Sequence, residues 1–277
     1  MPTTKWCGTP TAKPPDNSLM EAHKHLVKVL VPVYKPVLSD EEKCALQQMY
    51  KVLNKYPLVV IKPESLDLSF LTETYPLLTF HSFEDACFEG IAAYNRLMLS
   101  EQFYASFSDT RYILIYQLDA YVFRDELAQW CDKGYDYIGA PWLKKPLYDR
   151  PLVSGMMKCI RRYDQRRGKP NKQMLYNKVG NGGLSLRKVE SHYRATRQYG
   201  EQIDYFLKQK RSHLFNEDVF WATVPDFSYP EAKEALRFSF DKYPKYCYRL
   251  NNNRLPFGCH SWYKRKMKRF WASIIQK

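Results

Sequence analysis

The chain has 277 residues, of which 45% are hydrophobic and 16% aromatic, enough to bury the core of one large domain. Its start, MPTTKWCGTPTAKPPDNS, lacks the apolar stretch of a secretory signal, and no later window approaches the length of a membrane span. Seven scattered cysteines without a C-x-x-C pair argue against a disulfide framework and a zinc knuckle. These features predict a cytoplasmic globular protein with reduced thiols.

The formal net charge of +14 is concentrated in two segments. Residues 143–178 carry 11 Lys or Arg against two acids, Asp149 and Asp164, and residues 263–277 carry six bases and no acid. Elsewhere bases and acids nearly balance. Such segments are typical of contact with an anionic partner, either a nucleic acid or an acidic glycan, lipid diphosphate or anionic membrane surface.

The first half of the chain alternates between strand and helix patterns. Residues 1–24 are predicted to form a flexible leader, followed by a buried strand, LVKVLVPVYK, that Pro32 ends. Ser39 and Glu42 form a capping-box signature before apolar residues at helical spacing. PLVVIKP predicts a second strand, residues 83–107 a mainly helical stretch, and RYILIY a buried strand whose carboxyl end leads to Asp119.

The second half continues the alternation. DELAQWCDKG predicts a helix closed by Gly134, and YDYIGAPW a strand that ends at Pro141 and Trp142. A basic loop at 143–178 precedes the strand in VGNGGLSLRKV, a helical stretch to about residue 210, and an acidic element, FNEDVFWATV. This order predicts a single α/β domain with a mainly parallel sheet flanked by helices.

Four groups of polar residues near the ends of these elements are candidates for a functional site. They are Asp119, the Asn181-Gly182-Gly183 turn, the pair Glu217-Asp218, and His260. Each of these four groups can also be explained by a purely structural role. An acid after a strand can cap the next helix, acids after an N-cap suit the helix dipole, a lone histidine can be a buried structural residue, and a double glycine can form only a tight turn.

Five motifs in this order, YQLDAYVF, DYIGAPW, VGNGGLSLR, NEDVFW and LPFGCHSW, resemble an uncharacterised microbial domain family regarded as glycosyltransferases. More distantly they resemble the GT-A superfamily, which includes fringe-like and β-1,3-galactosyltransferase enzymes. The resemblance runs from about Val27 to Trp262. It implies one GT-A-like, Rossmann-like domain over residues 25–262, followed by a basic aromatic tail at 263–277.

The resemblance also implies a metal site. In GT-A enzymes a D-x-D motif holds a divalent ion on the sugar-nucleotide diphosphate, and a late histidine often completes the metal shell. Asp119 and His260 match these positions, whereas Gln117 stands in place of the first aspartate and offers a weaker oxygen ligand. Oxygen ligands with one imidazole suit Mn²⁺ or Mg²⁺. The donor-binding residues implied in the same way are Pro32, Tyr34, Asn95 and Asp119.

The x-E-D element of GT-A enzymes supplies the catalytic base. It implies that Asp218, with Glu217 beside it, takes the proton of an acceptor hydroxyl and that the sugar carbon is inverted, with retention as the alternative. We expect the acceptor to contact Trp142, because an aromatic face suits a sugar ring, although Trp142 fits a core position equally. The residues of the 181–183 turn are the other expected acceptor contacts, because glycine lets the backbone approach a ligand closely.

These expectations describe a glycosyltransferase that moves a sugar from a nucleotide-sugar donor to a glycan or lipid-linked glycan, as in the synthesis of cell-surface polysaccharides. A catalytically inactive GT-A-like carbohydrate-binding protein is one alternative, suggested by Gln117. A basic nucleic-acid-binding protein is another, disfavoured because the acids at 119, 217 and 218 would repel phosphate.

The tail, YKRKMKRFWASIIQK, combines bases with the apolar residues Phe270, Trp271, Ile274 and Ile275. This pattern is typical of interfacial helices and predicts peripheral attachment at the inner face of an anionic membrane. A solvated basic end is the alternative.

Overall fold

The structure is a computed structural model that describes residues 23–168, 170–209 and 213–275. Its main sheet has six strands in the order β3-β2-β1-β4-β7-β6, and β7 runs in the direction opposite to the other five. The six are β1 (Val27–Pro32), β2 (Leu58–Pro63), β3 (Leu78–Phe83), β4 (Tyr112–Tyr116), β6 (Tyr137–Ile138) and β7 (Leu184–Lys188). The predicted mainly parallel α/β sheet is therefore confirmed.

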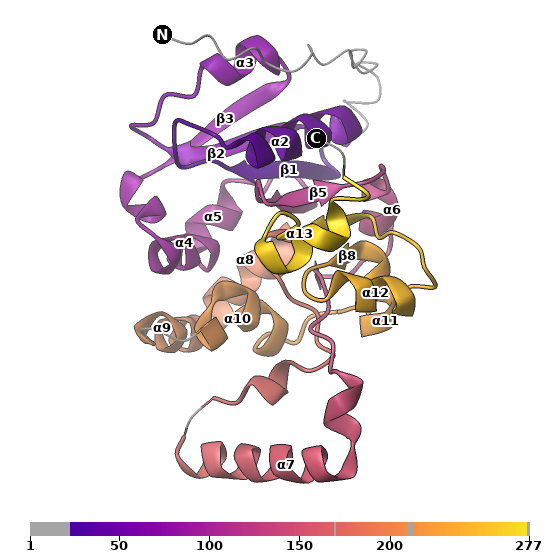
Figure 1. Ribbon diagram of the computed structural model, residues 1–277. Coiled ribbons are helices and arrows are strands. Elements are labelled where there is room, and N and C mark those ends of the chain that lie inside the picture. Colours follow the sequence, from indigo (N-terminus) through magenta and orange to yellow (C-terminus); the bar gives the residue numbers. More distant parts are fainter. Residues whose placement is uncertain (1–22, 169, 210–212, 276–277) are drawn as a thin grey trace.

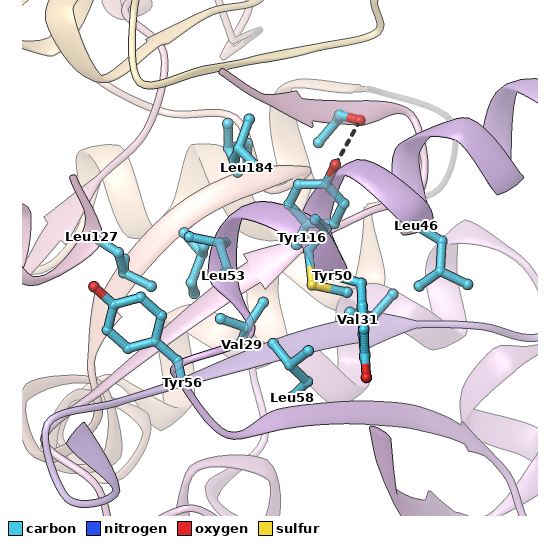
Figure 2. Close-up of a cluster of buried hydrophobic side chains, with 14 of the residues drawn as sticks. Val29, Val31, Leu46, Tyr50, Leu53, Tyr56, Leu58, Tyr116, Leu127 and Leu184 are labelled. Atoms are coloured by element: carbon cyan, nitrogen blue, oxygen red, sulfur yellow. Dashed lines mark hydrogen bonds between the residues drawn. The ribbon is translucent and has the colours of Figure 1, made fainter. Parts of the chain in front are cut away.

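Helices cover both faces of this sheet, which is why its central strands read as continuous apolar runs. On one face α2 (Asp40–Leu53) packs on β1, and Figure 2 shows Leu46 and Leu53 of this helix in one cluster with Val29 and Val31. The predicted capping box forms at its start, where the Ser39 side chain accepts from the Glu42 N–H and Glu42 accepts from the Ser39 N–H.

The opposite face carries a second apolar cluster, built from β-strand residues such as Leu30 and Ile115 together with helices α4, α5, α8, α9 and α10. The helices other than α2 and α7 are α3 (Phe70–Thr74), α4 (Ile91–Met98), α5 (Glu101–Ala105), α6 (Leu127–Asp132), α8 (Val189–Gln198), α9 (Gly200–Lys208), α10 (Glu217–Thr223), α11 (Ala232–Phe238), α12 (Pro244–Leu250) and α13 (Arg265–Trp271).

The structure also has a second, smaller sheet, which was not predicted from the sequence. It consists of β5 (Ala120–Val122), β9 (Gly258–His260) and β8 (Ser239–Phe240), in the order β5-β9-β8. Because β5 pairs with β9, Ala120 lies opposite His260 in the register. This pairing brings His260 beside the strand-end acid, Asp119.

The segment 143–178, expected to be a loop, is largely helical. We call it the basic arm. It contains the helix α7 (Pro151–Arg166), flanked by short 3-10 turns at Pro146–Asp149 and Lys172–Leu175. Figure 1 shows α7 projecting away from the sheets and the other helices.

The tail at 263–277 differs from the expected interfacial helix. Trp271 and Ile275 are buried in a third apolar cluster, and the Trp271 ring stacks on Phe123 with centroids 5.5 Å apart. The apolar residues of α13 therefore complete the core of the small sheet, while Lys266 and Arg269 stay exposed. The leader predicted for residues 1–24 lies almost entirely outside the described residues.

Candidate functional site

A cavity of about 700 Å³ opens at the carboxyl ends of β1 and β4. Open α/β sheets place their ligands at this edge. All the residues singled out from the sequence line it, namely Pro32, Tyr34, Asn95, Gln117, Asp119, Trp142, Asn181, Gly182, Gly183, Glu217, Asp218 and His260. The fold thus collects in one place side chains that are distant along the chain.

Asp119 lies in the turn between β4 and β5 and faces two cations. Its Oδ1 is 2.8 Å from Nε2 of His260, and its Oδ2 is 2.9 Å from Nζ of Lys264. Burial opposes ionisation of Asp119, but the positive charges of His260 and Lys264 outweigh it and hold the pKa of the carboxyl well below its usual range. The Asp119 side chain is therefore a carboxylate near neutral pH.

His260 lies between two carboxylates. Its Nδ1 is 3.3 Å from Oδ1 of Asp241, on the side of the ring opposite Asp119. Burial disfavours a charged ring, yet Asp119 and Asp241 together raise the pKa of His260 to about 9. Nδ1 also contacts Nδ2 of Asn181 at 3.0 Å and Oγ of Ser261 at 3.1 Å, so this edge of the ring is fixed in place.

These residues fit an open divalent-cation site. Nε2 of His260 is buried, and its one close polar contact, with Asp119, lacks the geometry of a hydrogen bond although the two atoms are 2.8 Å apart. An imidazole nitrogen and a carboxylate oxygen that lie side by side would be available as two ligands for a divalent cation. Asp241 on Nδ1 has the position of an outer carboxylate that orients a metal-binding histidine.

The described residues near Asp119 and His260 do not supply a complete set of ligands for a cation. Over the described ranges, no group of three or more His, Cys, Asp and Glu side chains is arranged to hold a metal ion. This agrees with the geometry, because Asp241 approaches the far nitrogen of the His260 ring and cannot share a cation with Asp119. Mg²⁺-type sites often have one or two protein ligands and are completed by water and substrate phosphates.

The double glycine has a packing role that the sequence did not reveal. A Cβ on Gly182 would lie 2.0 Å from Oε1 of Glu217, and a Cβ on Gly183 would lie 2.1 Å from Nε2 of His260. Both glycines are needed because these two side chains fill the space over them. Asn181, with φ 77°, accepts from the Gly183 N–H at 2.9 Å, so its side chain is engaged within the turn.

Glu217 is the buried partner of Arg187. Arg187 points inward from β7 and donates to Glu217, to the Tyr104 hydroxyl and to Ser185, each at 3.1 Å. Burial raises the pKa of Glu217 to about 7, although Arg187 opposes the shift. This pair anchors the first turn of α10 against the sheet.

Asp218 follows Glu217 but is only partly buried and lines the cavity. Burial raises the pKa of its carboxyl above the ordinary value. The start of α10 is also held from outside the helix, because Asn95 Oδ1 accepts from the Glu217 N–H at 3.3 Å and Asn95 Nδ2 donates to Asn216 at 3.2 Å. Asn95, expected as a donor contact, thus has a second role in positioning the acidic pair.

The remaining predicted residues form the walls. Tyr34 follows β1 and Pro32, and its ring is 61% exposed at the cavity, where it is open to stacking. Trp142 packs against Gly180, where a Cβ would meet the indole at 2.0 Å, and its remaining surface lines the cavity. Trp142 is therefore both a packing residue and part of the lining.

Sequence reasoning missed several charged residues of the cavity. These are Asp241, Lys264, Lys35 and Lys242. Asp241 follows the strand β8 directly, the same strand-end position that drew attention to Asp119, but β8 has only two residues and gives no sequence signal. Lys264 was predicted to be one of the bases of the tail at 263–277 and not a residue of the cavity.

Solved structures of several glycosyltransferases have a related fold. The galactosyltransferase LgtC, in complex with donor and acceptor sugar analogs, superposes with a TM-score of 0.51 at 11% identity, covering 90% of this chain and 96% of that one. GlyE from Streptococcus pneumoniae TIGR4 gives 0.52 at 11% identity, covering 91% of this chain and 61% of GlyE. Mouse xyloside xylosyltransferase 1 gives 0.50 at 12% identity, covering 84% and 97%.

At these identities the likeness establishes the fold, which is of the GT-A type. None of the curated proteins matches the sequence. A family described as "Protein of unknown function (DUF5672)" matches residues 77–260, well over half of the chain. The protein is therefore a member of the DUF5672 family.

Proposed function

We propose that the protein is a glycosyltransferase that binds a nucleotide-sugar in the cavity and transfers the sugar to a hydroxyl of a glycan or lipid-linked glycan. The observation that supports it is the convergence of Asp119, His260 and Asp218 on one cavity at the carboxyl edge of a GT-A-type sheet. A role in cell-surface polysaccharide synthesis, in the cytoplasm and at the inner face of the membrane, belongs to the same proposal. Among the described residues, no helix has the length and apolarity to cross a bilayer.

Charge on the leaving diphosphate is neutralised in two ways in this proposal. Asp119 and His260, with the Gln117 carbonyl as a weaker ligand, hold Mn²⁺ or Mg²⁺, which when bound stabilises negative charge on the diphosphate as a Lewis acid. Lys264, 2.9 Å from Asp119, supplies a positive charge from the protein itself. Lys242 adds a further cation at the cavity, whereas the charge of Lys35 is paired with Glu42 at 2.7 Å.

The nucleotide lies on the β1 side in this proposal. Pro32 and Tyr34 line that wall, and the exposed Tyr34 ring offers an aromatic face to the base. Trp142 lines the cavity at the start of the basic arm, where its indole offers a face to the acceptor sugar.

Asp218 is the proposed base. It is the less buried member of the acidic pair, and its raised pKa brings it closer to that of a base working near neutral pH. Glu217 is tied to Arg187 and positions the helix start. With Asp218 on the acceptor side, direct displacement inverts the sugar carbon. Anomeric assignment of the product by NMR distinguishes this from retention.

The first test is a thermal-shift screen of UDP-, GDP-, CMP- and dTDP-sugars with and without Mn²⁺. A ligand that binds the native state raises the unfolding temperature by mass action. We expect one nucleotide class to stabilise the protein and Mn²⁺ to increase the shift. A flat response to every sugar-nucleotide, together with salt-sensitive binding of oligonucleotides, would favour the nucleic-acid-binding alternative.

The second test separates an enzyme from a sugar-binding relic. Asp218→Asn should lower turnover strongly, by about 10²- to 10⁴-fold for loss of a general base, while donor affinity stays within a few-fold. Asp226→Asn, at an exposed carboxylate outside the cavity lining, is the matched control. Donor binding by the wild type without transfer or hydrolysis would identify an inactive carbohydrate-binding protein. Loss of donor binding in Asp218→Asn would make Asp218 a donor ligand.

A further inference from the structure

The helix α7 presents an apolar stripe to solvent. Leu152, Met156, Ile160 and Tyr163 are 90%, 56%, 42% and 55% exposed. Their spacing of three and four residues places them on one face of the helix. Within the described part of the chain, no side chain of α7 is buried, although the helix has 16 residues. A helix of a globular protein ordinarily turns such a face to the core, so this stripe is available to an external partner.

The other side of α7 is basic. Lys158, Arg161 and Arg162 project from the side of the helix away from the stripe, Arg166 lies at the edge of the stripe, and Asp164 is the helix's one acid. The arm as a whole, residues 143–178, carries 11 bases against two acids. The same helix thus combines a contiguous apolar face with a basic opposite side.

The arm is held in shape by its own contacts. The side chain of Gln173 donates to the Met157 carbonyl at 2.7 Å, and the rings of Tyr148 and Tyr176 stack with centroids 5.7 Å apart. At its neck the chain is closed by the bridge between Pro141 and Val179. The stripe is therefore presented on an ordered support that projects from the body of the protein (Figure 1).

Three partners can be compared by charge and polarity. A second copy of the chain would bring two strongly positive arms together, and a nucleic acid would engage the bases but leave the stripe in water. The interface of an anionic bilayer accommodates both faces, because apolar side chains enter the acyl region while Lys and Arg stay at the headgroups. We propose that α7 attaches the protein to membranes that contain anionic lipid, with the stripe inserted.

This proposal assigns attachment to the arm and not to the tail. The apolar residues Trp271 and Ile275 of the tail are buried, so their side chains are unavailable for insertion. The arm leaves the fold at Trp142, which lines the cavity, so attachment through α7 would bring a lipid-linked acceptor beside the site. That last step rests on the proposed function, whereas membrane binding by α7 does not.

The test is co-sedimentation of the full-length protein with vesicles of phosphatidylcholine alone or mixed with phosphatidylglycerol, without any nucleotide-sugar. We expect recovery with the mixed vesicles only. Leu152→Asp/Ile160→Asp should reduce partitioning at least about tenfold, because the inserted apolar area is lost and charges are added. Arg161→Gln/Arg162→Gln should reduce it by about 30-fold, because the attraction of two bases to the lipid charge is lost.

The matched control is Val37→Asp/Leu250→Asp, which adds the same charge at apolar residues that are 75% and 42% exposed elsewhere. It should partition nearly as the wild type does, and all variants should keep the wild-type unfolding temperature.

Equal recovery of the stripe variant and the wild type, or no recovery with the mixed vesicles, would overturn the proposal. A dimer or an RNA complex in place of vesicle binding would overturn it in favour of those partners. Vesicle binding by a protein that shows no donor binding would leave this proposal standing while the proposed function fails.

Discussion

Arg187 and Glu217 form an ion pair at 3.1 Å with side-chain exposures of 0% and 5%. The pair joins β7 to the first turn of α10, so it holds the acidic pair of the cavity against the sheet. Replacing both charges of such a pair with apolar groups is often tolerated, but removing one partner leaves the other buried alone.

We therefore expect Arg187→Met to lower the free energy of unfolding by about 3–5 kcal/mol, because it leaves the Glu217 carboxyl without its cation. The double variant Arg187→Met/Glu217→Leu should be less destabilised than the single one. Urea denaturation of the two single variants, Arg187→Met and Glu217→Leu, and of the double variant measures the coupling. If the double variant loses as much stability as the two single variants added together, the coupling inferred here is wrong.

A second prediction concerns Gly183, which packs against His260. Gly183→Ala places a Cβ 2.1 Å from His260 Nε2, so the ring has to move. We expect a loss of about 1–3 kcal/mol and a smaller Mn²⁺-dependent thermal shift with the donor. Gly155→Ala is the control, because a Cβ there meets nothing within 4 Å and alanine favours the helix by up to about 1 kcal/mol. Similar effects of the two substitutions would contradict the packing role of Gly183.

His260 makes stability depend on pH. Its pKa rises from an ordinary 6.5 to about 9 on folding, so the stabilisation is complete below pH 6.5 and is lost as the pH rises to about 9. In chelator-treated buffer, the stability difference between the wild type and His260→Gln should shrink over this interval by about 3 kcal/mol. Chemical denaturation at a series of pH values measures it. A difference that stays constant with pH would show that the ring is neutral in the native state.

The tail makes a prediction about stability. Trp271 is 0% exposed and stacks on Phe123, so Trp271→Ala should cost about 3–5 kcal/mol. Phe270→Ala, at the partly buried neighbouring position, should cost clearly less. Thermal and urea unfolding compare the two. Equal, small losses would restore the interpretation of residues 263–277 as a separable tail.

Sequence patterns located most of the main sheet because its strands and helices carry the signals locally. The capping box at Ser39 and Glu42 and the apolar run that becomes β4 are examples, and both formed where expected. The strand β3 was missed because it lies at the sheet edge, where its half-exposed pattern resembles that of a loop. The small sheet was missed because strands of two or three residues leave no periodicity.

The site was predictable in part for the same reason. Asp119 and Asp218 stand out as acids among apolar neighbours, and the fold brings both to the cavity. Asp241 and Arg187 were missed because their roles depend on pairing between segments far apart in the chain. The amphipathic character of α7 was obscured because its Gly155, its leading proline and the surrounding bases read as a loop.

Hydrogen bonds join the two ends of the basic arm where it leaves the rest of the fold. The Trp142 N–H donates to the Lys178 carbonyl at 2.9 Å, and the Asn177 N–H donates to the Trp142 carbonyl at 2.8 Å. Because these contacts and the bridge between Pro141 and Val179 join the two ends of the arm, we expect the cavity lining to keep its arrangement when the intervening residues are shortened or exchanged. If α7 binds membranes as proposed, changes within the arm would alter membrane attachment without altering the cavity.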